Sequence, residues 1–267
     1  MTRVAIVGAG VAGLTSAHAL SAGADVLLVD RLPACGGVLP FDHRAIRDLV
    51  RSAQRAGVKF ALGATGTRWT GEQLLVAAPG AIRWEPADHL VYAGGSRPST
   101  AAELRLAGVA RLAGVLPAPV AVHLLEAGVR IGSNVVVVGS GDWARRTLDE
   151  LAHQRTRAIT VTLPNEPAPA LAPGSGDRYA GWTPTVVSGK GRVGEVLIER
   201  EGATQRILCD ALVLGARLRP LRNVDGAIED NPSTTFIQHI AEHATIDEVE
   251  MHARQASQAL IKRLVGD

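Results

Sequence analysis

Residues 4–30 read "VAIVGAGVAGLTSAHALSAGADVLLVD", and they carry the strongest indication of the fold. An apolar segment runs directly into the glycine turn at residues 8–13, and helical character follows over residues 14–22. Residues 24–30 then return as a second apolar segment that ends at Asp30. A strand, a glycine turn, a helix and a second strand form a βαβ unit, which predicts a parallel sheet of the α/β class.

The spacing Gly-x-Gly-x-x-Gly gives each glycine of this turn a different steric role. Gly8 permits the tight turn, Gly10 allows the backbone to approach a pyrophosphate, and Gly13 allows the helix to pack closely on the strand. The free N–H groups at the helix start favour a negative charge, and Asp30 lies where an acid accepts hydrogen bonds from an adenosine ribose. The predicted ligand contacts on this unit are Gly8, Gly10, Val11, Ala12, Gly13 and Asp30. The alternative interpretation is a glycine-rich turn without a ligand.

Two further stretches indicate which dinucleotide is bound. "RLPACGGVLP" (31–40) places Gly36-Gly37 shortly after Asp30, and "HLVYAGGSRPST" (89–100) ends a second apolar strand in glycines. Both resemble the FAD-binding flavoproteins with two dinucleotide domains, in which paired glycines pass near the adenosine and pyrophosphate. The second stretch looks like that family's Ala-Thr-Gly strand end, with glycine in place of the threonine. The resemblance implies FAD as the cofactor and adds Arg31, Gly36, Gly37, Ala93, Gly94 and Gly95 to its contacts.

A second strand, glycine turn and helix occur in "SNVVVVGSGDWARRTLDELAH" (133–153). The order of segments resembles the pyridine-nucleotide disulfide reductase superfamily, in which a nicotinamide-type domain is inserted into a split FAD domain. The predicted fold is therefore α/β, with a Rossmann-like FAD domain interrupted by a smaller Rossmann-like NAD(P)-type domain. The predicted limits are 1–103 and 215–267 for the FAD domain and 104–214 for the inserted domain.

The second turn leaves NAD(P) binding open. Gly139, Gly141 and Ala144 satisfy the Gly-x-Gly-x-x-Ala variant, in which the small third residue still allows close packing. Asp142, however, places a carboxylate where a pyrophosphate would lie, and Trp143 is bulky. The alternative is a domain retained for structure or docking after it lost its nucleotide.

Two departures from the resembled families narrow the chemistry. Cys35 precedes Gly36-Gly37, and Cys209 falls on a predicted strand, so both are expected to be ordinary buried thiols rather than a redox pair beside the flavin. In "AEHAT" (241–245), Glu242-His243 stands where the families carry the Gly-Asp that binds the ribityl or pyrophosphate region, and Glu242 is the predicted substitute contact.

Catalytic residues do not stand out in the sequence. Asp42 and His43 follow the paired glycines and are weak candidates, as are Glu242 and His243 near the end of the chain. An Asp-His pair at the start of a helix is more often a turn or a helix cap. The pair Thr245 and Glu248 predicts a capping box for a last helix over 247–264.

The nearest resemblance is to the FAD subunits of hydrogen cyanide synthase, of opine and hydroxyproline dehydrogenases, and of heteromeric sarcosine oxidase (alpha chain). It rests on "GGVLP", on "AGGSRPST", and on the path through "AGVLPAPVAVHLLEAGVRIGSNVVVVGSG" (113–141). It implies oxidation of an amine or amino acid as a small-molecule substrate. It also implies a partner protein subunit or a homo-oligomer.

Composition limits the remaining classes of function. The chain has 267 residues, 46% of them apolar, and a formal charge of +2 without basic blocks, which argues against a nucleic-acid ligand. Its apolar runs are too short to span a bilayer, and its histidines and cysteines do not form a metal-binding pattern. Two distant cysteines fit a reducing cytoplasm.

The leading hypothesis is an FAD-dependent oxidoreductase of the dehydrogenase type that acts as a subunit of a larger complex. One alternative is a non-catalytic scaffold or regulatory subunit that binds FAD or its ADP part. Another is an NAD(P)H-dependent flavoprotein reductase.

Overall fold

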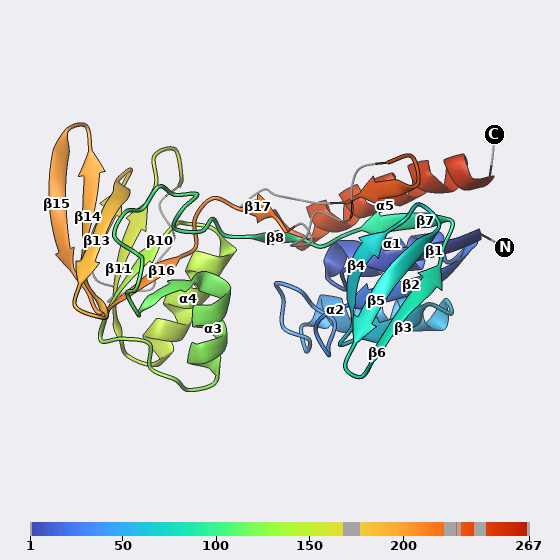
Figure 1. Cartoon of the computed structure of the whole chain (residues 1–267), viewed down its shortest axis with the longest axis horizontal. Helices are drawn as coiled ribbons and strands as arrows, with labels where there is room; N and C mark the ends of the chain where they lie inside the picture. The colour runs from blue at the N-terminus through green and yellow to red at the C-terminus, as the bar shows by residue number, and fades with distance from the viewer. Residues whose placement is uncertain (1, 168–176, 222–227, 229–230, 238–243, 266–267) are drawn as a thin grey trace. The chain divides into compact units, whose positions relative to one another are not determined.

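The computed structural model describes residues 2–167, 177–221, 228, 231–237 and 244–265, and it divides the chain into two compact units (Figure 1). Unit 1 combines the residues up to Ser96 with the return segment from Pro220, and unit 2 is Arg97–Arg219. One unit is thus inserted into the other, in the order that the sequence predicted. The boundaries in the structure lie outside the segment 104–214 that the sequence assigned to the inserted domain.

Unit 1 is built on a five-stranded sheet with the strand order β18-β7-β1-β2-β3. Every neighbouring pair in it is parallel. Its strands are β1 (Thr2–Val7), β2 (Ala24–Asp30), β3 (Lys59–Leu62), β7 (His89–Tyr92) and β18 (Thr234–Phe236). The chain runs from β1 through β2 to β3 on one side and places β7 on the other side of β1, so the strand order reverses at β1. Ligands of open α/β sheets bind at such a reversal, beyond the carboxyl ends of the strands.

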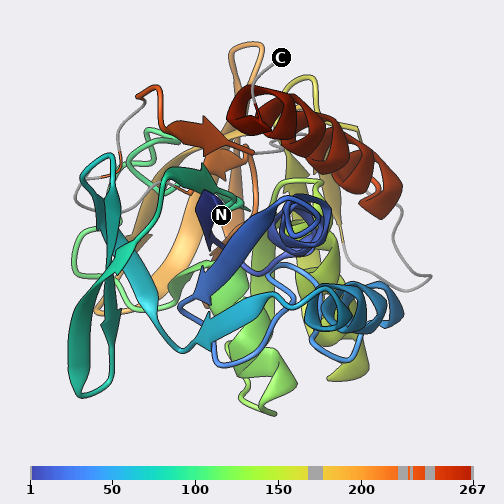
Figure 2. The same cartoon turned by 90° about the vertical axis from the view of Figure 1, so that its right-hand side faces the viewer.

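Each face of this sheet has its own core, because successive side chains of a strand point to opposite faces. Val4 and Ile6 of β1 pack with the helices α1 (Val11–Leu20), α2 (Arg44–Arg55) and α5 (Ile246–Val265). Ala5 packs on the other face, against the antiparallel sheet of β4 (Thr65–Trp69), β5 (Gln73–Ala78) and β6 (Ala81–Pro86). Figure 2 shows these helices on one side of the parallel strands and the β5–β6 hairpin on the other.

Unit 2 repeats this plan. Its parallel sheet has the order β12-β11-β10-β16-β9, with helices α3 and α4 between its strands in the sequence, and β13-β14-β15 form a separate antiparallel sheet. The parallel strands are β9 (Val115–Pro117), β10 (Asn134–Val138), β11 (Arg157–Thr162), β12 (Arg178–Ala180) and β16 (Ala211–Leu214). The helices are α3 (Ala118–Glu126) and α4 (Asp142–His153), and the antiparallel strands are β13 (Thr183–Gly189), β14 (Val193–Arg200) and β15 (Ala203–Leu208).

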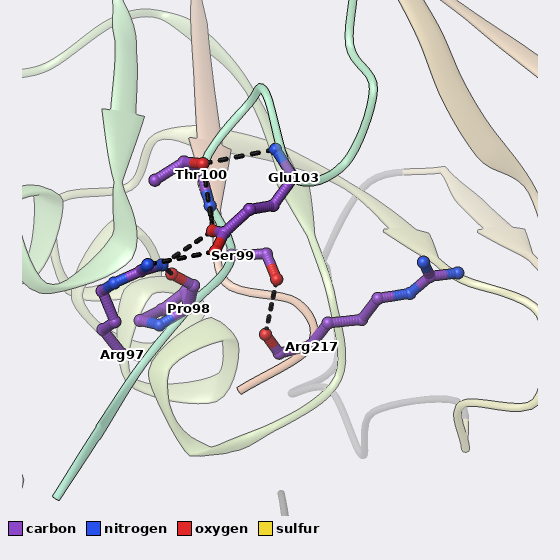
Figure 3. A network of polar contacts seen from close by, with 6 residues as sticks. All are labelled: Arg97, Pro98, Ser99, Thr100, Glu103 and Arg217. Carbon is purple, nitrogen blue, oxygen red and sulfur yellow. Dashed lines mark hydrogen bonds and ion pairs between the residues drawn. The ribbon is translucent and has the colours of Figure 1, made fainter. Parts of the chain in front are cut away.

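The two segments that connect the units pair as a short ribbon of β8 (Ser96–Arg97) and β17 (Arg219–Pro220). Beyond it, in unit 2, the Ser99 hydroxyl donates to the Arg217 carbonyl oxygen at 2.8 Å (Figure 3). The Arg97 guanidinium binds both oxygens of Glu103, at 2.8 and 3.0 Å. This bidentate contact and the Thr100 N–H lower the pKa of Glu103 to about 2. Both connecting segments are therefore anchored where they enter unit 2.

Candidate cofactor site

The turn after β1 has backbone geometry that only glycine satisfies at two positions. Gly8 has a φ of +109°, and a Cβ there would lie 2.1 Å from the carbonyl oxygen of Ala93 at the end of β7. A Cβ on Gly13 would lie 1.7 Å from the Gly8 carbonyl oxygen. Gly13 therefore lets α1 pack directly on the turn, as its position in the sequence predicted.

The N-terminus of α1 has the features of an anion site. Gly10 is its N-cap residue, it provides no side-chain cap, and the first turn contains no acidic residue. A Cβ on Gly10 would make only ordinary contacts, with the Gly36 oxygen at 3.8 Å and the Gly37 Cα at 3.9 Å, so the Gly36-Gly37 backbone packs beside the start of the helix. Val11 and Ala12 are partly exposed at the same helix end. Free N–H groups at the start of a helix favour a phosphate group.

Asp30 is fixed at the end of β2 beside this turn. Its carboxylate accepts a hydrogen bond of 2.6 Å from the Ala9 N–H and one of 2.8 Å from the Leu32 N–H. Each carboxylate oxygen has further acceptor capacity, so these bonds orient the group without exhausting it. Arg31, the next residue, is exposed.

The paired glycines lie against the turn. The Gly36 N–H donates to the Ala9 carbonyl oxygen at 2.9 Å, and Gly36 forms a bridge with Gly10. Gly37 has a φ of +66°, and a Cβ on it would lie 3.3 Å from the Gly10 Cα. Two backbone segments that are far apart in the sequence therefore face each other without side chains between them.

The end of β7 completes this cluster. The Ala93 N–H donates to the Val7 carbonyl oxygen at 2.8 Å, which holds this strand end beside the turn. A Cβ on Gly94 would lie 2.7 Å from the Tyr92 ring, which accounts for glycine in place of the family's threonine. The Leu221 N–H donates to the Gly95 carbonyl oxygen at 2.8 Å.

The structure thus brings the glycine turn, Asp30, Gly36-Gly37 and the 93–95 segment together at the carboxyl edge of β1, β2 and β7. Sequence reasoning missed the contacts that organise them, namely the N–H groups of Ala9 and Leu32 on Asp30 and the Tyr92 ring at Gly94. Backbone donors have no signature in the sequence, and the Tyr92 ring gains its importance from its position alone.

The structure describes two of the four candidate catalytic residues. Asp42 is exposed, and His43 is the N-cap residue of α2, where its Nδ1 accepts from the Ala45 N–H at 3.3 Å. Glu242 and His243 lie outside the described residues. No role of these four residues in catalysis or cofactor binding is tested by this geometry, so these roles stay predictions.

The predicted capping box of the last helix is present at α5. The Thr245 N–H donates to Glu248 at 2.8 Å, and the Glu248 N–H donates to the Thr245 hydroxyl at 3.2 Å. The helix begins at Ile246, one residue before the predicted start.

The second glycine turn, after β10, resembles the first in its backbone conformation but differs in its side chains. Gly139 has a φ of +115°, and a Cβ on it would lie 2.7 Å from the Ala216 nitrogen. Gly141 is the N-cap residue of α4, but Asp142 occupies the first turn and pairs with Arg145 at 3.3 Å. Trp143 is buried, with the Arg146 guanidinium 5.4 Å from the centre of its ring. A Cβ on Gly215 would lie 3.1 Å from the Ala144 Cβ, consistent with close packing at that small residue.

The two cysteines do not form a redox pair. Cys35 is buried in unit 1 and Cys209 is buried in unit 2, and both are free thiols. Burial raises the pKa of Cys35 to about 11, with a further contribution from Asp30. Burial raises the pKa of Cys209 to about 12, with smaller contributions from Asp210 and Glu195. Both shifts favour the neutral thiol at neutral pH, as expected of buried thiols near carboxylates.

Over the described ranges, no helix combines the length and apolar character that a membrane crossing needs. The same residues contain no cluster of three or more His, Cys, Asp or Glu side chains arranged to bind a metal ion.

With this geometry established, comparison with known proteins assigns the first part of the chain. Residues 2–117 match the family of pyridine nucleotide-disulphide oxidoreductases. The matched segment contains the glycine turn, Asp30, Gly36-Gly37 and the 93–95 strand end. Over this segment, the predicted resemblance to the superfamily is confirmed. At the level of this family, the predictions of an oxidoreductase enzyme and of FAD as cofactor are confirmed as well. A comparison with curated proteins gives no match.

Solved structures confirm the predicted fold. Thioredoxin reductase from Lactococcus lactis (FR conformation) is similar with a TM-score of 0.70 and 16% identity, covering 99% of this chain and 99% of that chain. Thioredoxin reductase from T. acidophilum has a TM-score of 0.68 and 14% identity, with 100% of both chains covered. L-proline dehydrogenase from P. horikoshii has a TM-score of 0.68 and 18% identity, covering 100% of this chain and 57% of that chain.

Proposed function

We propose that the chain is an FAD-dependent oxidoreductase whose glycine turn, together with the adjoining Asp30 and Gly36-Gly37, forms a cradle for the ADP part of FAD. The observation that carries this proposal is the N-terminus of α1, which has no side-chain cap, is surrounded by glycine backbone and lies beside the fixed carboxylate of Asp30. When bound, FAD supplies the hydride and electron transfer, and the protein supplies binding and orientation.

The residues of this cradle have separate tasks in the proposal. The N–H groups of Val11 and Ala12 face the pyrophosphate, where the helix dipole adds to their attraction. Asp30 accepts hydrogen bonds from the adenosine ribose through the acceptor capacity that Ala9 and Leu32 leave. Gly10 and Gly37 keep side chains out of the cradle.

The proposed electron route does not pass through cysteine. The family that matches residues 2–117 is named for pyridine nucleotides and disulphides, but the two cysteines of this chain lie in different units and have raised pKa values. A dehydrogenase-type reaction that passes electrons from a small molecule through the flavin needs no such pair. The fold that the chain shares with L-proline dehydrogenase supports an amine or amino acid as the substrate. A role as one subunit of a larger complex follows from the resemblance to heteromeric FAD subunits.

The second glycine turn favours one alternative, an NAD(P)H-dependent flavoprotein reductase. Gly139 and Gly141 keep the backbone plan of a dinucleotide turn, and the carboxylate of Asp142 is neutralised in part by Arg145. A scaffold that binds FAD without catalysis is the remaining alternative.

The proposal is tested first by flavin binding to a Gly10→Ala variant. A Cβ at this position makes ordinary contacts at 3.8 Å or more, so the fold tolerates it, but it occupies the cradle. We expect FAD affinity to fall about tenfold or more, with the melting temperature of the apoprotein unchanged. Gly23→Ala is the matched control, because a Cβ there would meet nothing within 4 Å. Equal FAD affinity for both variants and the wild type would refute the proposed cradle.

A second measurement separates the three functions. Anaerobic bleaching of the bound flavin by an amine or amino acid supports the dehydrogenase, and bleaching by NADH or NADPH supports the reductase. A flavin that neither class of donor reduces, in a chain that copurifies with another protein, supports the scaffold.

A further inference from the structure

The antiparallel sheet of unit 1 ends in an unpaired strand. β6 (Ala81–Pro86) pairs with β5 on one side, and no described strand pairs with its other side. Every residue of β6 except Glu85 is exposed. The β5–β6 hairpin, drawn in teal, extends from the parallel sheet in Figure 2. An open strand edge is a template for pairing with another strand.

The pairing with β5 determines which β6 residues offer their backbone to a partner. The Ala87 N–H donates to the Glu72 carbonyl oxygen at 3.0 Å, which fixes the alternation of hydrogen-bonded pairs along this ladder. Hydrogen-bonded and non-hydrogen-bonded pairs alternate along an antiparallel ladder. Residues of β6 that are an odd number of positions from Ala87 in the sequence therefore do not bond to β5. Ile82 and Trp84 precede Ala87 by five and three positions. Their N–H and C=O groups therefore point to the free edge.

These same two residues carry exposed apolar side chains. Ile82 is 75% exposed and Trp84 is 43% exposed. They stand opposite Ala77 and Leu75 of β5, so the four side chains share one face of the sheet. Exposed apolar residues scattered singly are ordinary, whereas these adjoin one another beside an open strand edge.

The sequence of β6 is complementary to itself in the register centred on Trp84, in which the ion pair that Arg83 and Glu85 form within one chain is extended by the same pair of the second copy. If two copies pair antiparallel about Trp84, Arg83 of each chain stands opposite Glu85 of the other, and the two Trp84 residues stand opposite each other. Shifting the centre to Arg83 places two arginines opposite each other, and shifting it to Glu85 places two glutamates opposite each other. A centre at Ile82 leaves both charges without a cross-strand partner. Opposite charges directly across an antiparallel pair stabilise it, and like charges destabilise it.

We propose that β6 is the dimerisation edge of this chain, and that its partner is β6 of a second copy in the register centred on Trp84. The pairing joins two three-stranded sheets into one six-stranded sheet. It covers Ile82 and Trp84, and it forms reciprocal hydrogen bonds between the two Trp84 backbones. The Ile82 N–H of each chain donates to the Pro86 carbonyl oxygen of the other. Pro86 has no N–H, so the opposite Ile82 carbonyl oxygen receives no bond from it. This symmetric contact closes, so it yields a dimer rather than a fibre.

Amide hydrogen exchange of the wild-type protein at several concentrations tests the register directly. We expect the Ile82 and Trp84 amides to become protected as the dimer forms, while the exchange of the Arg83 amide, already bonded to β5, changes little. Sedimentation velocity in parallel gives the oligomeric state. A chain that stays monomeric at all concentrations, or a dimer whose Ile82 and Trp84 amides exchange as in the monomer, overturns the proposal. Protection that arises only when a different protein is added overturns it too.

Charge exchange tests the specificity of the pairing. Arg83→Glu places like charges across both symmetric contacts, and we expect the dimer dissociation constant to rise about tenfold or more. The double variant Arg83→Glu/Glu85→Arg restores opposite charges and is expected to recover the wild-type constant. Lys59→Glu is the control, because its exposed ion pair with Asp25 joins β2 and β3 rather than β6. Circular dichroism confirms that each variant is folded, and a wild-type dissociation constant for Arg83→Glu refutes the register.

The proposed dimer and the proposed flavin site depend on different residues. FAD absorbance of the Arg83→Glu variant is expected to equal that of the wild type, so failure of one proposal leaves the other intact.

Discussion

The carboxylate of Asp30 accepts a hydrogen bond of 2.6 Å from the backbone N–H of Ala9, which joins the end of β2 to the glycine turn after β1. The contact makes Asp30 part of the turn's own structure, and in the proposed function Asp30 is also a ligand contact. A site whose polar groups are fixed before the ligand arrives loses less freedom on binding. Four consequences of the structure can be measured.

The first prediction concerns Asp30. Asp30→Asn keeps one acceptor but turns an amide NH₂ toward the N–H of either Ala9 or Leu32. We expect the free energy of unfolding to fall by about 1–3 kcal/mol and FAD affinity to fall about tenfold. Denaturant titration and flavin fluorescence measure the two effects. Asp25→Asn, on the same strand but in an exposed ion pair with Lys59, is expected to cost at most about 1 kcal/mol. Equal losses in the two variants would contradict the role of Asp30.

The second prediction concerns Gly13. Its Cβ would lie 1.7 Å from the Gly8 carbonyl oxygen, so Gly13→Ala forces α1 away from the turn. We expect a loss of more than about 3 kcal/mol in the free energy of unfolding, even without FAD. Gly23→Ala is expected to stay within about 0.5 kcal/mol of the wild type. A Gly13→Ala protein with normal stability would show that the helix and turn do not approach as described.

The third prediction concerns pH. His89 is buried on β7, its Nε2 lies 2.9 Å from the Thr235 hydroxyl, and burial lowers its pKa to about 4, with a smaller contribution from Arg263. The neutral ring is therefore favoured in the folded chain, whereas the unfolded chain takes up a proton below the ordinary pKa of 6.5. The contribution of His89 to the free energy of unfolding is therefore complete above pH 6.5. It decreases as the pH falls toward 4, by at most about 1.4 kcal/mol per pH unit.

Chemical denaturation at pH 7 and pH 5 measures this loss. His89→Gln is expected to flatten the pH dependence. His153→Gln, which changes an exposed side chain on α4, is expected to retain it. A His89→Gln protein with the full wild-type dependence would assign the effect to other groups.

The fourth prediction concerns the thiols. With pKa values of about 11 and about 12, Cys35 and Cys209 are almost entirely protonated at pH 8, so the folded protein should react with iodoacetamide at least about 100-fold more slowly than the unfolded chain. Mass spectrometry of timed samples measures both rates. A Cys35→Ser/Cys209→Ser protein is expected to keep the flavin reduction of the wild type. If this variant still binds FAD but its flavin is no longer reduced, a cysteine takes part in the electron transfer.

The glycine spacing and the apolar pattern were enough to predict the α/β class and the inserted second unit, and they supplied the candidate residues of the proposed cofactor cradle. These features depend on local rules: the glycine spacing in 8–13, the alternation of apolar residues in strands, and the Thr245–Glu248 capping box all act over a few residues. Such signals are complete within a short window, so they can be found without knowing what lies nearby in space.

Tertiary structure decided which partners those residues meet. The hydrogen bond from the Ala9 N–H to Asp30 and the close approach of the Ala93 oxygen to Gly8 join segments that are 21 and 85 residues apart, and neither contact follows from the local sequence. The free edge at β6 is likewise a consequence of strand order. An alternating pattern predicts a strand, but the pairing of the whole sheet determines which strand is left without a neighbour.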